Sequence, residues 1–533
     1  MPATASDGTN GPATDHDPTA QVNPGFLEPL GTIIIHPGSR FLRIGKSTDI
    51  FPHAIEHVIA RKTKAAATSE DSNPLDSNSP DRETQLTHIF DQMDIELRQR
   101  LKDAKRRPVN NALTMVTNFN EKAQPELISD HNDPYKVEWT DVKRQEPYYT
   151  DTPATAAPCR SEYVMRWPIQ RGQFNWRDYT SMHAVLGDLE TIWADAIEHE
   201  LGIPRAQFHR WSAVLVIPDL YHRHQVEALM NLVLNYLGLR RILIQQEAAC
   251  VTFGAGISSA CIVDVGAQKT SAVCVEDGYC LPTTRVQAQY GGDDISLVLA
   301  ELLVRHSFPY TEFSYLNRAY DWQLLNDLKE KYGTLNEADV TVQVYDFVAR
   351  VPYQVARKYR FKVYDEPYLA SMTLFYPKLL EYLAPFSSST SVSATPAASS
   401  PAPQWISQPD ELAPYKLQPL DTIITHCISH SGPEDRCKRY YANIILVGGG
   451  CALTPLFANF LESRLLRARP AHLQGIEKIQ VLPSPRDLDP RVLAWKGASV
   501  LSKLDIAGEM WIQGPEWNEL GTKNFKNRLL FFW

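Results

Sequence analysis

Residues 262–278 read IVDVGAQKTSAVCVEDG, and the interpretation of the chain starts from this stretch. Two apolar, β-branched runs flank a turn near Ala267 and Gln268, so the stretch predicts a β-hairpin. Upstream, SAVLVIPDL from Ser212 predicts a buried strand, HQVEALMNLVLNYLG a helix that ends at Gly238, and RILIQQ another strand. A strand, a helix and a strand in this order form a βαβ unit, so we expect an α/β fold with a mainly parallel sheet.

Two further stretches share the pattern of a glycine turn directly after a buried strand. GTIIIHPGSRFLRIG at 31–45 predicts a hairpin around Gly38, and ANIILVGGGCALTPLFANFLESRLL at 442–466 predicts a strand, a triple-glycine turn and a helix. Glycine lets the backbone approach a ligand, and the amides of such turns suit phosphate oxygens. Taken singly, any one of these turns is more often an ordinary tight corner. Their shared position after a strand favours phosphate binding.

Composition and charge narrow the class of protein. The chain has 533 residues, 22% charged and 44% hydrophobic, which is typical of globular proteins. The formal net charge of −9 argues against bulk attraction to nucleic acid or an anionic membrane, although it allows a local basic face. The N-terminus has no signal-peptide pattern, and no apolar run is long enough to span a membrane. We expect a soluble protein of the cytosol or nucleus.

The eight cysteines include no C-x-x-C pair, which argues against a zinc ribbon or a redox dithiol. Several lie inside apolar runs such as CIVDVG. We therefore expect buried, reduced thiols.

A basic segment lies in the first third of the chain. Residues 65–81 are polar and predict a surface loop, and THIFDQMDIELRQRLKDAKRR at 87–107 predicts a helix with an apolar stripe. Its end, RQRLKDAKRRP at 98–108, is the densest basic run. Either it is a solvated helix end whose cations favour the helix dipole, or it binds DNA phosphates. The DNA-binding candidates are Lys102, Lys105, Arg106 and Arg107.

The motifs occur along the chain in the order found in a known family. IIIHPGSRFLRIG is similar to its first phosphate loop and IVDVGAQKTSAVCVEDG to its second, while YGGDDIS, DLKEKY, ILVGGGCALTP, LAWKGASVL and EMWIQGPEWNELG complete the series. The chain thus resembles an actin-related protein of the actin/hexokinase/Hsp70 superfamily. HPGS, WPIQRGQ, DPRVLAWKG and the terminal FFW are similar to a nuclear member that is a subunit of the Ino-eighty chromatin-remodelling complex.

The resemblance implies an α/β, actin-like two-lobed ATPase fold with family-specific insertions. We expect a disordered tail at 1–25. The first lobe, subdomains 1 and 2, would span 26–254 plus 493–533, with an insertion at about 62–160. The second lobe, subdomains 3 and 4, would span 255–492, with a low-complexity insertion at about 387–414.

The resemblance also implies a nucleotide site. The residues that match nucleotide-binding positions of the family are Gly38, Ser39, Arg40, Arg43, Asp264, Gly266, Thr270, Gly292, Lys329, Glu330, Gly448, Gly449, Gly450 and Arg491. Arg40 replaces a glycine, so its side chain either contacts phosphate or fills the site.

The hydrolytic positions depart from the family pattern. His36 and Ala267 replace two acidic residues, Glu247 replaces the glutamine that orients the attacking water, and Ser271 replaces a nearby histidine. Asp264 remains as the carboxylate expected near Mg²⁺. Losing a water-orienting group costs several kcal/mol of transition-state stabilisation. We therefore expect ATP to be bound weakly or structurally, no catalytic residue, and at most residual ATPase activity. The alternative is an active ATPase or kinase of the same superfamily.

The resemblance finally implies a location and partners. We expect a nuclear protein without a membrane partner that binds the helical docking segment of a remodeller ATPase. It would do so beside nuclear actin and another nuclear actin-related protein, and contribute to binding linker DNA or the nucleosome. The C-terminal LLFFW either anchors the tail in the core or binds a partner helix. For such a helix we expect a wall near 253–256 and Trp495.

Overall fold

The structure is a computed structural model that describes residues 29–63, 80–141, 146–159, 162–316, 318–383, 417–473, 475–476, 478–485, 488–531 and 533. The predicted tail at 1–25, the low-complexity insertion at 387–414 and most of the predicted loop at 65–81 lie outside these residues. None of the described helices is long and apolar enough to cross a membrane.

A six-stranded sheet forms the centre of the first half of the structure, in the order β20-β11-β10-β1-β2-β3. β1 pairs in parallel with β10, and β10 with β11, while β1 and β2 form the predicted antiparallel hairpin. The strands are β1 (Gly31–Pro37), β2 (Phe41–Lys46), β3 (His53–Glu56), β10 (Trp211–Ile217), β11 (Arg241–Gln246) and β20 (Ile512–Gln513). The predicted βαβ unit is confirmed.

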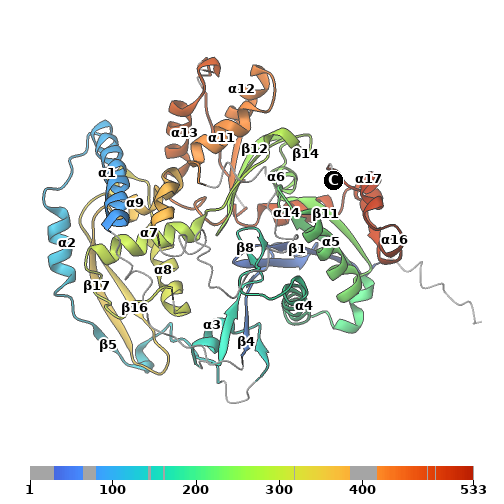
Figure 1. Cartoon of the computed structure of the whole chain (residues 1–533), viewed down its shortest axis with the longest axis horizontal. Helices are drawn as coiled ribbons and strands as arrows, with labels where there is room; N and C mark the ends of the chain where they lie inside the picture. The colour runs from blue at the N-terminus through green and yellow to red at the C-terminus, as the bar shows by residue number, and fades with distance from the viewer. Residues whose placement is uncertain are drawn as a thin grey trace, which may run out of the picture.

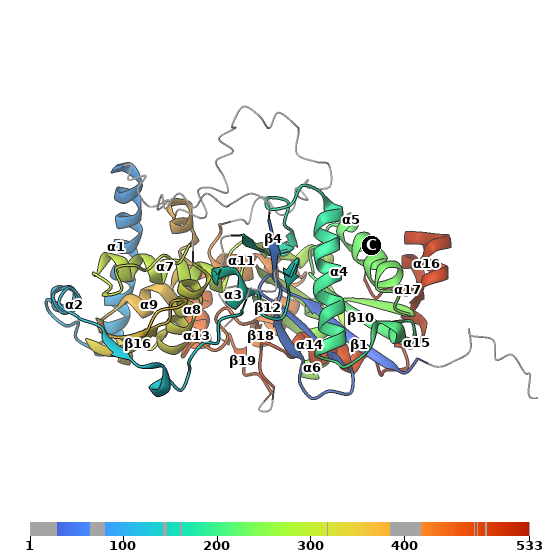
Figure 2. The same cartoon turned by 90° about the horizontal axis from the view of Figure 1, so that it is seen from below.

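Alternate residues of β1 point to opposite faces of this sheet, and both sets are apolar. Helices therefore cover both faces. Ile33 and Ile35 pack in one core with Trp193 of α4 (Met182–His199), whereas Ile34 packs in another with Trp495 of α14 (Leu493–Leu501). Two further helices belong to this half: α5 (Arg223–Asn231), which a π-helical turn (Leu232–Tyr236) continues, and α6 (Glu247–Ala255). Figure 2 shows α4 and α5 against the strands β1 and β10.

A second sheet repeats this arrangement, in the order β14-β13-β12-β18-β19, with β15 paired to β13. β12 and β13 form the hairpin predicted from 262–278, and β12 pairs in parallel with β18, as β1 does with β10. The strands are β12 (Ser259–Val265), β13 (Thr270–Glu276), β14 (Tyr279–Cys280), β15 (Val286–Ala288), β18 (Ile444–Val447) and β19 (Val481–Leu482). The two glycine hairpins that share a pattern in the sequence therefore occupy equivalent positions in two sheets of similar topology.

Helices pack around the second sheet, and a small separate sheet lies farther out, beyond α7 and α8 (Figure 1). The small sheet, in the order β16-β17-β5, combines β16 (Gln343–Ala349) and β17 (Ala356–Val363) with β5 (Glu126–Ile128). The helices of this half are α7 (Gly292–Arg305), α8 (Ala319–Tyr332), α9 (Glu366–Ser371), α11 (Leu420–Ser429), α12 (Glu434–Ala442) and α13 (Phe457–Ala468).

The part of the predicted insertion at about 62–160 that forms two helices packs on the second half, although we expected it within the first lobe, whereas residues 148–149 pair with the strand at 59–62. The two helices are α1 (Pro80–Asp103) and α2 (Ala112–Asn120), and Met93, Leu97 and Val116 are buried in the core of the second sheet. The apolar stripe predicted on α1 is confirmed. The helix starts within the segment predicted as a loop, since proline is well tolerated in a first helical turn. The outer limits of the two lobes stay a prediction.

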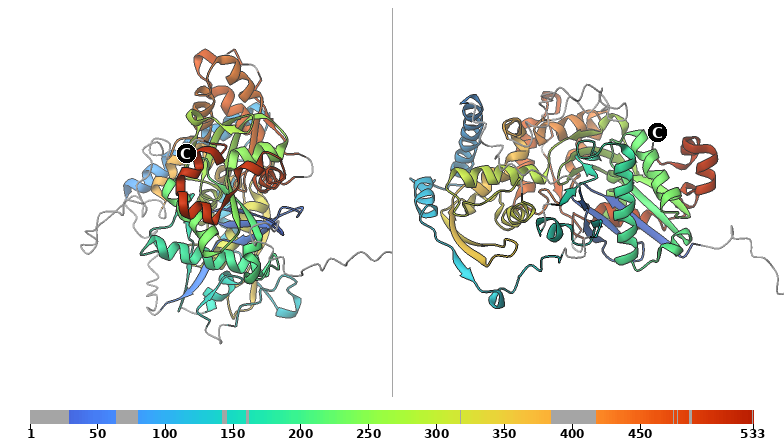
Figure 3. Two further views of the ribbon diagram at one scale, coloured as in Figure 1. Left: turned by 90° about the vertical axis from the view of Figure 1, so that its right-hand side faces the viewer. Right: turned by 60° about the horizontal axis from the view of Figure 1, so that its bottom comes forward.

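The last helices lie at the opposite end of the molecule from α1 and α2, as Figure 3 shows. They are α15 (Ala507–Met510), α16 (Gly514–Leu520) and α17 (Phe525–Arg528). Smaller elements complete the fold: β4 (Ile59–Lys62), β6 (Tyr148–Tyr149), β7 (Tyr163–Arg166), β8 (Ile169–Gln170), β9 (Gln173–Phe174) and α3 (Pro153–Ala156).

Candidate nucleotide site

Three glycine turns converge between the two sheets. The turn of the first hairpin contains Arg40, and the turn of the second contains Gln268. Both reach Asp293 at the start of α7: Arg40 Nε lies 3.2 Å from Asp293 Oδ2, and Gln268 Nε2 donates to the same oxygen at 2.9 Å. The third turn joins them because the Gly450 amide donates to Val265 O at 2.8 Å.

The glycines of the third turn permit backbone contact that a side chain would block. Gly448 has a φ of +94°, and a Cβ there would lie 2.2 Å from Val265 O. A Cβ on Gly292 would lie 2.8 Å from Gly450 Cα. These positions therefore hold the end of β12, the start of α7 and the third turn together before any ligand is considered.

The two hairpin turns keep backbone donors available. Within the described part of the chain, the amides of Ser39, Arg40, Ala267 and Gln268 donate no hydrogen bond to another protein group. Successive unpaired amides in a turn form a concave donor surface that suits phosphate oxygens. The arrangement therefore fits a polyphosphate between the hairpins.

Arg40 has protein partners at this point. Besides Asp293, its guanidinium carbon lies 4.9 Å from the ring centre of Trp322 and 5.5 Å from that of Trp167. Cation–π contacts of this kind hold a guanidinium in place. Arg40 thus links the first hairpin turn to α7 and α8.

Glu247, the residue in place of the water-orienting glutamine, is fully engaged. One carboxylate oxygen accepts from Lys269 Nζ, and the other lies 3.3 Å from His36 Nε2. Burial opposes ionisation of Glu247, but the adjacent Lys269 and His36 outweigh it and lower the pKa of Glu247 to about 2. Burial likewise opposes the charge of Lys269, and Glu247 and then Asp264 reverse this and raise its pKa. The pair is ionised, and each carboxylate oxygen of Glu247 already has one charged or polar protein partner.

Asp264 is the remaining candidate for Mg²⁺. Burial, and then the nearby charge of Glu247, raises the pKa of Asp264. Mg²⁺ in nucleotide sites is held by one or two carboxylates together with phosphate oxygens and waters. Asp264 supplies one such carboxylate, and the nearby Glu247 is already paired with Lys269.

The sequence matches the actin family over residues 27–529. Probable actin-related protein 8 of Schizosaccharomyces pombe is 32% identical over 94% of this chain and 85% of its own length. Actin-related protein 8 of Bos taurus is 31% identical over 94% of this chain and 92% of its own. The solved structure of human actin-related protein Arp8 in its ATP-bound state matches with a TM-score of 0.82 and 33% identity, covering 98% of this chain and 100% of that one.

The chain belongs to the actin family, within the group of actin-related protein 8. The α/β actin-like fold expected from the sequence is confirmed by the same comparisons.

The other actin-family positions predicted for nucleotide lie around these turns. Lys329 of α8 donates to Gly292 O at 2.8 Å, and Arg491 is bound to Asp489 beside Gly449. Several expected ligands already have protein contacts: Thr270 Oγ1 donates to Tyr290 O at 2.8 Å, Ser39 Oγ accepts from the Gly172 amide at 3.4 Å, and Arg43 lies near Asp264 and Arg491. Glu330 is exposed. Binding of nucleotide by these residues stays a prediction.

Several residues of the site were missed in the sequence. Asp293 and Lys269 lie inside the quoted motifs YGGDDIS and DVGAQKTS, so motif position was the available signal. His57, in HVIARK, supports the first turn: its Nδ1 lies 2.7 Å from Gly38 O, and Trp193 Nε1 donates to its Nε2 at 3.1 Å. Burial lowers the pKa of His57 to about 4, so the ring is neutral and Nδ1–H donates.

Asp219 was missed as well, and neither spacing nor motif pointed to it. It lies at the carboxyl end of β10, and its Oδ1 accepts from the Ala248 amide at 3.0 Å. Burial, and then the charge of Glu247, raises the pKa of Asp219 to about 7.

Two cavities lie away from the glycine turns. One, of about 250 Å³, is lined by residues that include Tyr332, Tyr345 and Tyr368. The other, of about 200 Å³, lies under the loop that contains Phe308 and Tyr310. Neither cavity is lined by the candidate phosphate donors, so the glycine turns are the better candidate for the nucleotide site.

The basic run at 98–108 divides into two parts. Arg100 is buried: it pairs with Glu96, and its guanidinium carbon lies 3.6 Å from the ring centre of Phe460. It is therefore unable to meet DNA. The four candidates Lys102, Lys105, Arg106 and Arg107 are exposed at and beyond the end of α1.

The C-terminal aromatic residues are anchored on the first half. Trp533 stacks on Tyr221 at 5.6 Å and contacts Phe525 at 4.3 Å between ring centres. Of the two readings of LLFFW, this favours the anchored tail. The Trp495 side chain itself is fully buried against β1, so it offers no surface to a partner helix. The wall expected near 253–256 and around Trp495 stays a prediction.

Proposed function

We propose that this protein is a non-motor subunit of a nuclear chromatin-remodelling complex. It binds ATP as a structural ligand with little hydrolysis, and it docks on the helical segment of the remodeller ATPase beside nuclear actin and another nuclear actin-related protein. Its exposed basic end of α1 contributes to contact with linker DNA. Its membership of the actin-related protein 8 group supports this role.

The observation that carries the non-motor role is the state of Glu247. A residue that orients water for attack on a phosphate must keep a polar atom directed at that water. Both carboxylate oxygens of Glu247 are engaged by Lys269 and His36 instead. With Ala267 and Ser271 at two other positions, the chain retains the phosphate-facing turns and lacks the groups that accelerate hydrolysis.

Retained binding of ATP follows from a separate set of groups. The unpaired amides of the two hairpin turns suit phosphate oxygens, and Arg40, which pairs with Asp293, and Arg43, near Asp264, are the cations of this region. The similar human protein was solved in an ATP-bound state. Mg²⁺, when bound, would neutralise phosphate charge, and Asp264 is the residue that would hold its water shell.

Docking is tested by a co-purification experiment. The full chain should be retained by an immobilised helical docking segment of the remodeller ATPase when nuclear actin is also present. A long helix of unrelated sequence, matched in length and charge, is the control. Equal retention on both helices would contradict the proposed partner.

The DNA contact makes a separate prediction. Replacing Lys102, Lys105, Arg106 and Arg107 by Glu should weaken DNA binding and reduce the slope of log affinity against log salt by up to about 4. A control variant changes the exposed Arg210, Lys503, Lys523 and Lys526 to Glu, so both carry the same change in net charge. Fluorescence anisotropy with duplex DNA at several salt concentrations measures both. An equal loss in the two variants would mean that bulk charge, and not this segment, attracts DNA.

A further inference from the structure

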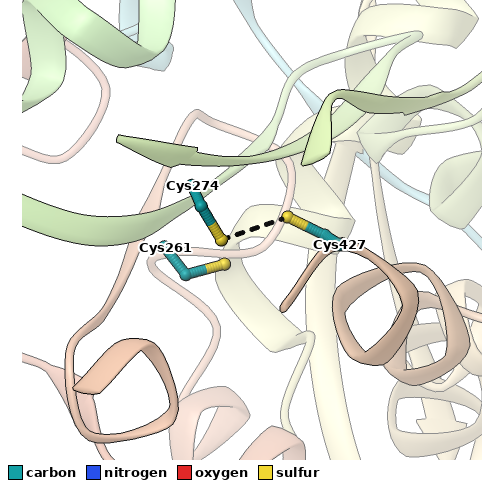
Figure 4. Close-up of side chains that lie close together, drawn as sticks. All are labelled: Cys261, Cys274 and Cys427. Atoms are coloured by element: carbon teal, nitrogen blue, oxygen red, sulfur yellow. Dashed lines mark hydrogen bonds between the residues drawn. The ribbon is translucent and has the colours of Figure 1, made fainter. Parts of the chain in front are cut away.

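Three cysteines from distant parts of the chain meet in the second half of the structure. Cys261 of β12 and Cys274 of β13 are directly opposite each other in the hairpin, and Cys427 comes from α11, which packs over it. Figure 4 shows the three side chains directed toward one another. Their Sγ atoms all lie within 4.8 Å of one another, and those of Cys274 and Cys427 are 3.6 Å apart.

The donor set is chemically selective. All three side chains are fully buried, and all three donors are sulfur. Thiolate and thiol ligands select soft ions such as Cu(I), whereas Mg²⁺ and Ca²⁺ require oxygen. No second cluster of three or more potential ligands occurs among the residues that the structure describes.

The spacing of the sulfurs suits three-coordinate binding. A metal–sulfur bond of about 2.3 Å places the ligands of a trigonal site about 4 Å apart. The observed 3.6 Å and the upper limit of 4.8 Å bracket that value. Small rotamer adjustments would therefore bring the three sulfurs around one ion.

The surroundings of the cluster limit the net charge that a complex there can carry. Tyr440 lies beside it, and its hydroxyl is buried without a hydrogen-bond partner among the described residues. A dry core favours a complex with no net charge.

We propose that Cys261, Cys274 and Cys427 form a three-coordinate binding site for Cu(I). On binding, one thiol releases its proton to the solvent as its metal–sulfur bond forms, so that the thiolate and the ion cancel in charge. The other two thiols complete the coordination through sulfur lone pairs, and no electron is transferred. The site lies outside the nucleotide turns, so it adds a metal-binding property to the structural role of this chain.

The test uses the full chain, reduced and freed of metal, and titrated anaerobically with Cu(I) against a colorimetric Cu(I) chelator. We expect one ion per chain and a first shell of sulfur only by X-ray absorption. Cys427→Ser should lower the affinity at least about 100-fold, because it removes a direct ligand. Cys437→Ser is the matched control, since Cys437 is buried in the same core but donates to Ile428 O at 3.3 Å. Its affinity should equal that of the unmodified chain.

Three results would overturn the proposal: equal affinity in the Cys427→Ser and Cys437→Ser variants, nitrogen or oxygen ligands in the first shell, or tighter binding of Zn(II) than of Cu(I) under the same competition. If Cys427→Ser fails to fold by circular dichroism, X-ray absorption on the unmodified chain decides. Three sulfur ligands then support the site, and any other shell contradicts it.

Discussion

At the scale of single residues, the buried pair of Lys269 and Glu247 dominates the site. Two ionised groups in a dry position are tolerated only because each neutralises the other. Lys269 follows the second hairpin turn and Glu247 begins α6, so the pair also joins the two halves of the structure. A residue that departs from the family pattern therefore has a structural role in this chain.

Removing one partner of this pair should be costly. We expect Lys269→Met to lower the free energy of unfolding by about 3 kcal/mol, because it leaves the Glu247 carboxylate buried without its cation. Adding Glu247→Gln should restore most of the loss. Urea denaturation measures both, with the exposed Lys438→Met as a control that should behave like the unmodified chain. A double variant no more stable than Lys269→Met alone would show that the pair is not the source of the effect.

Asp219 makes a prediction about pH. Its pKa is about 7 in the folded chain against an ordinary 3.8, so the folded state binds the extra proton between these values. Stability contributed by this group therefore falls as pH rises from about 4 to 7, by on the order of 4 kcal/mol.

Asp219→Asn keeps an oxygen for the Ala248 amide and carries no titrating proton. It should raise the free energy of unfolding at pH 7 and flatten its dependence on pH between about 4 and 7. Urea denaturation across this range measures the change, and Asp346→Asn at an exposed ion pair is the control. If the free energy of unfolding depends on pH in the same way in Asp219→Asn and in the unmodified chain, this prediction is wrong.

For single residues, the sequence predicted which side chains occupy the site better than it predicted which of them contact one another. The replacements at His36, Glu247 and Ala267 are visible in the motifs. The pairing of Glu247 with Lys269 is not visible there, because it depends on how α6 packs against the second hairpin in space. For the same reason the sequence did not reveal the environment of Asp219.

At the scale of elements, periodicity predicted what forms but not where it packs. Alternating apolar residues were sufficient for the two hairpins and the βαβ unit, because these contacts are local in the chain. The stripe on α1 predicted a helix with one buried face. It held no information about which core covers that face, and the structure places it on the second sheet.

Packing of α1 can be tested on the helix itself. Leu97→Ala should lower the free energy of unfolding by about 2 to 4 kcal/mol, because Leu97 is buried and its loss leaves a cavity. Ile95→Ala, on the exposed face of the same helix, should have little effect. Urea denaturation compares them, and equal effects would mean that α1 does not pack as described.

At the scale of the whole molecule, the two halves are joined by charged contacts around the glycine turns. Arg40 contacts Asp293, and Arg171 Nη2 lies 3.4 Å from Asp294 Oδ1. Together with Lys269 and Glu247, these contacts join the first hairpin turn, the loop between β8 and β9 and the start of α6 to the second half of the structure. Each lies beside the unpaired turn amides, so binding of a polyphosphate there should hold the halves together more tightly.

The account depends on a cleft that binds ATP without turning it over rapidly. The direct test measures binding by isothermal titration and phosphate release at saturating ATP and Mg²⁺ on the same preparation. We predict saturable binding with turnover at least about 100-fold below the 1–100 per second typical of kinases. Turnover within that range, or no binding of ATP, would contradict it.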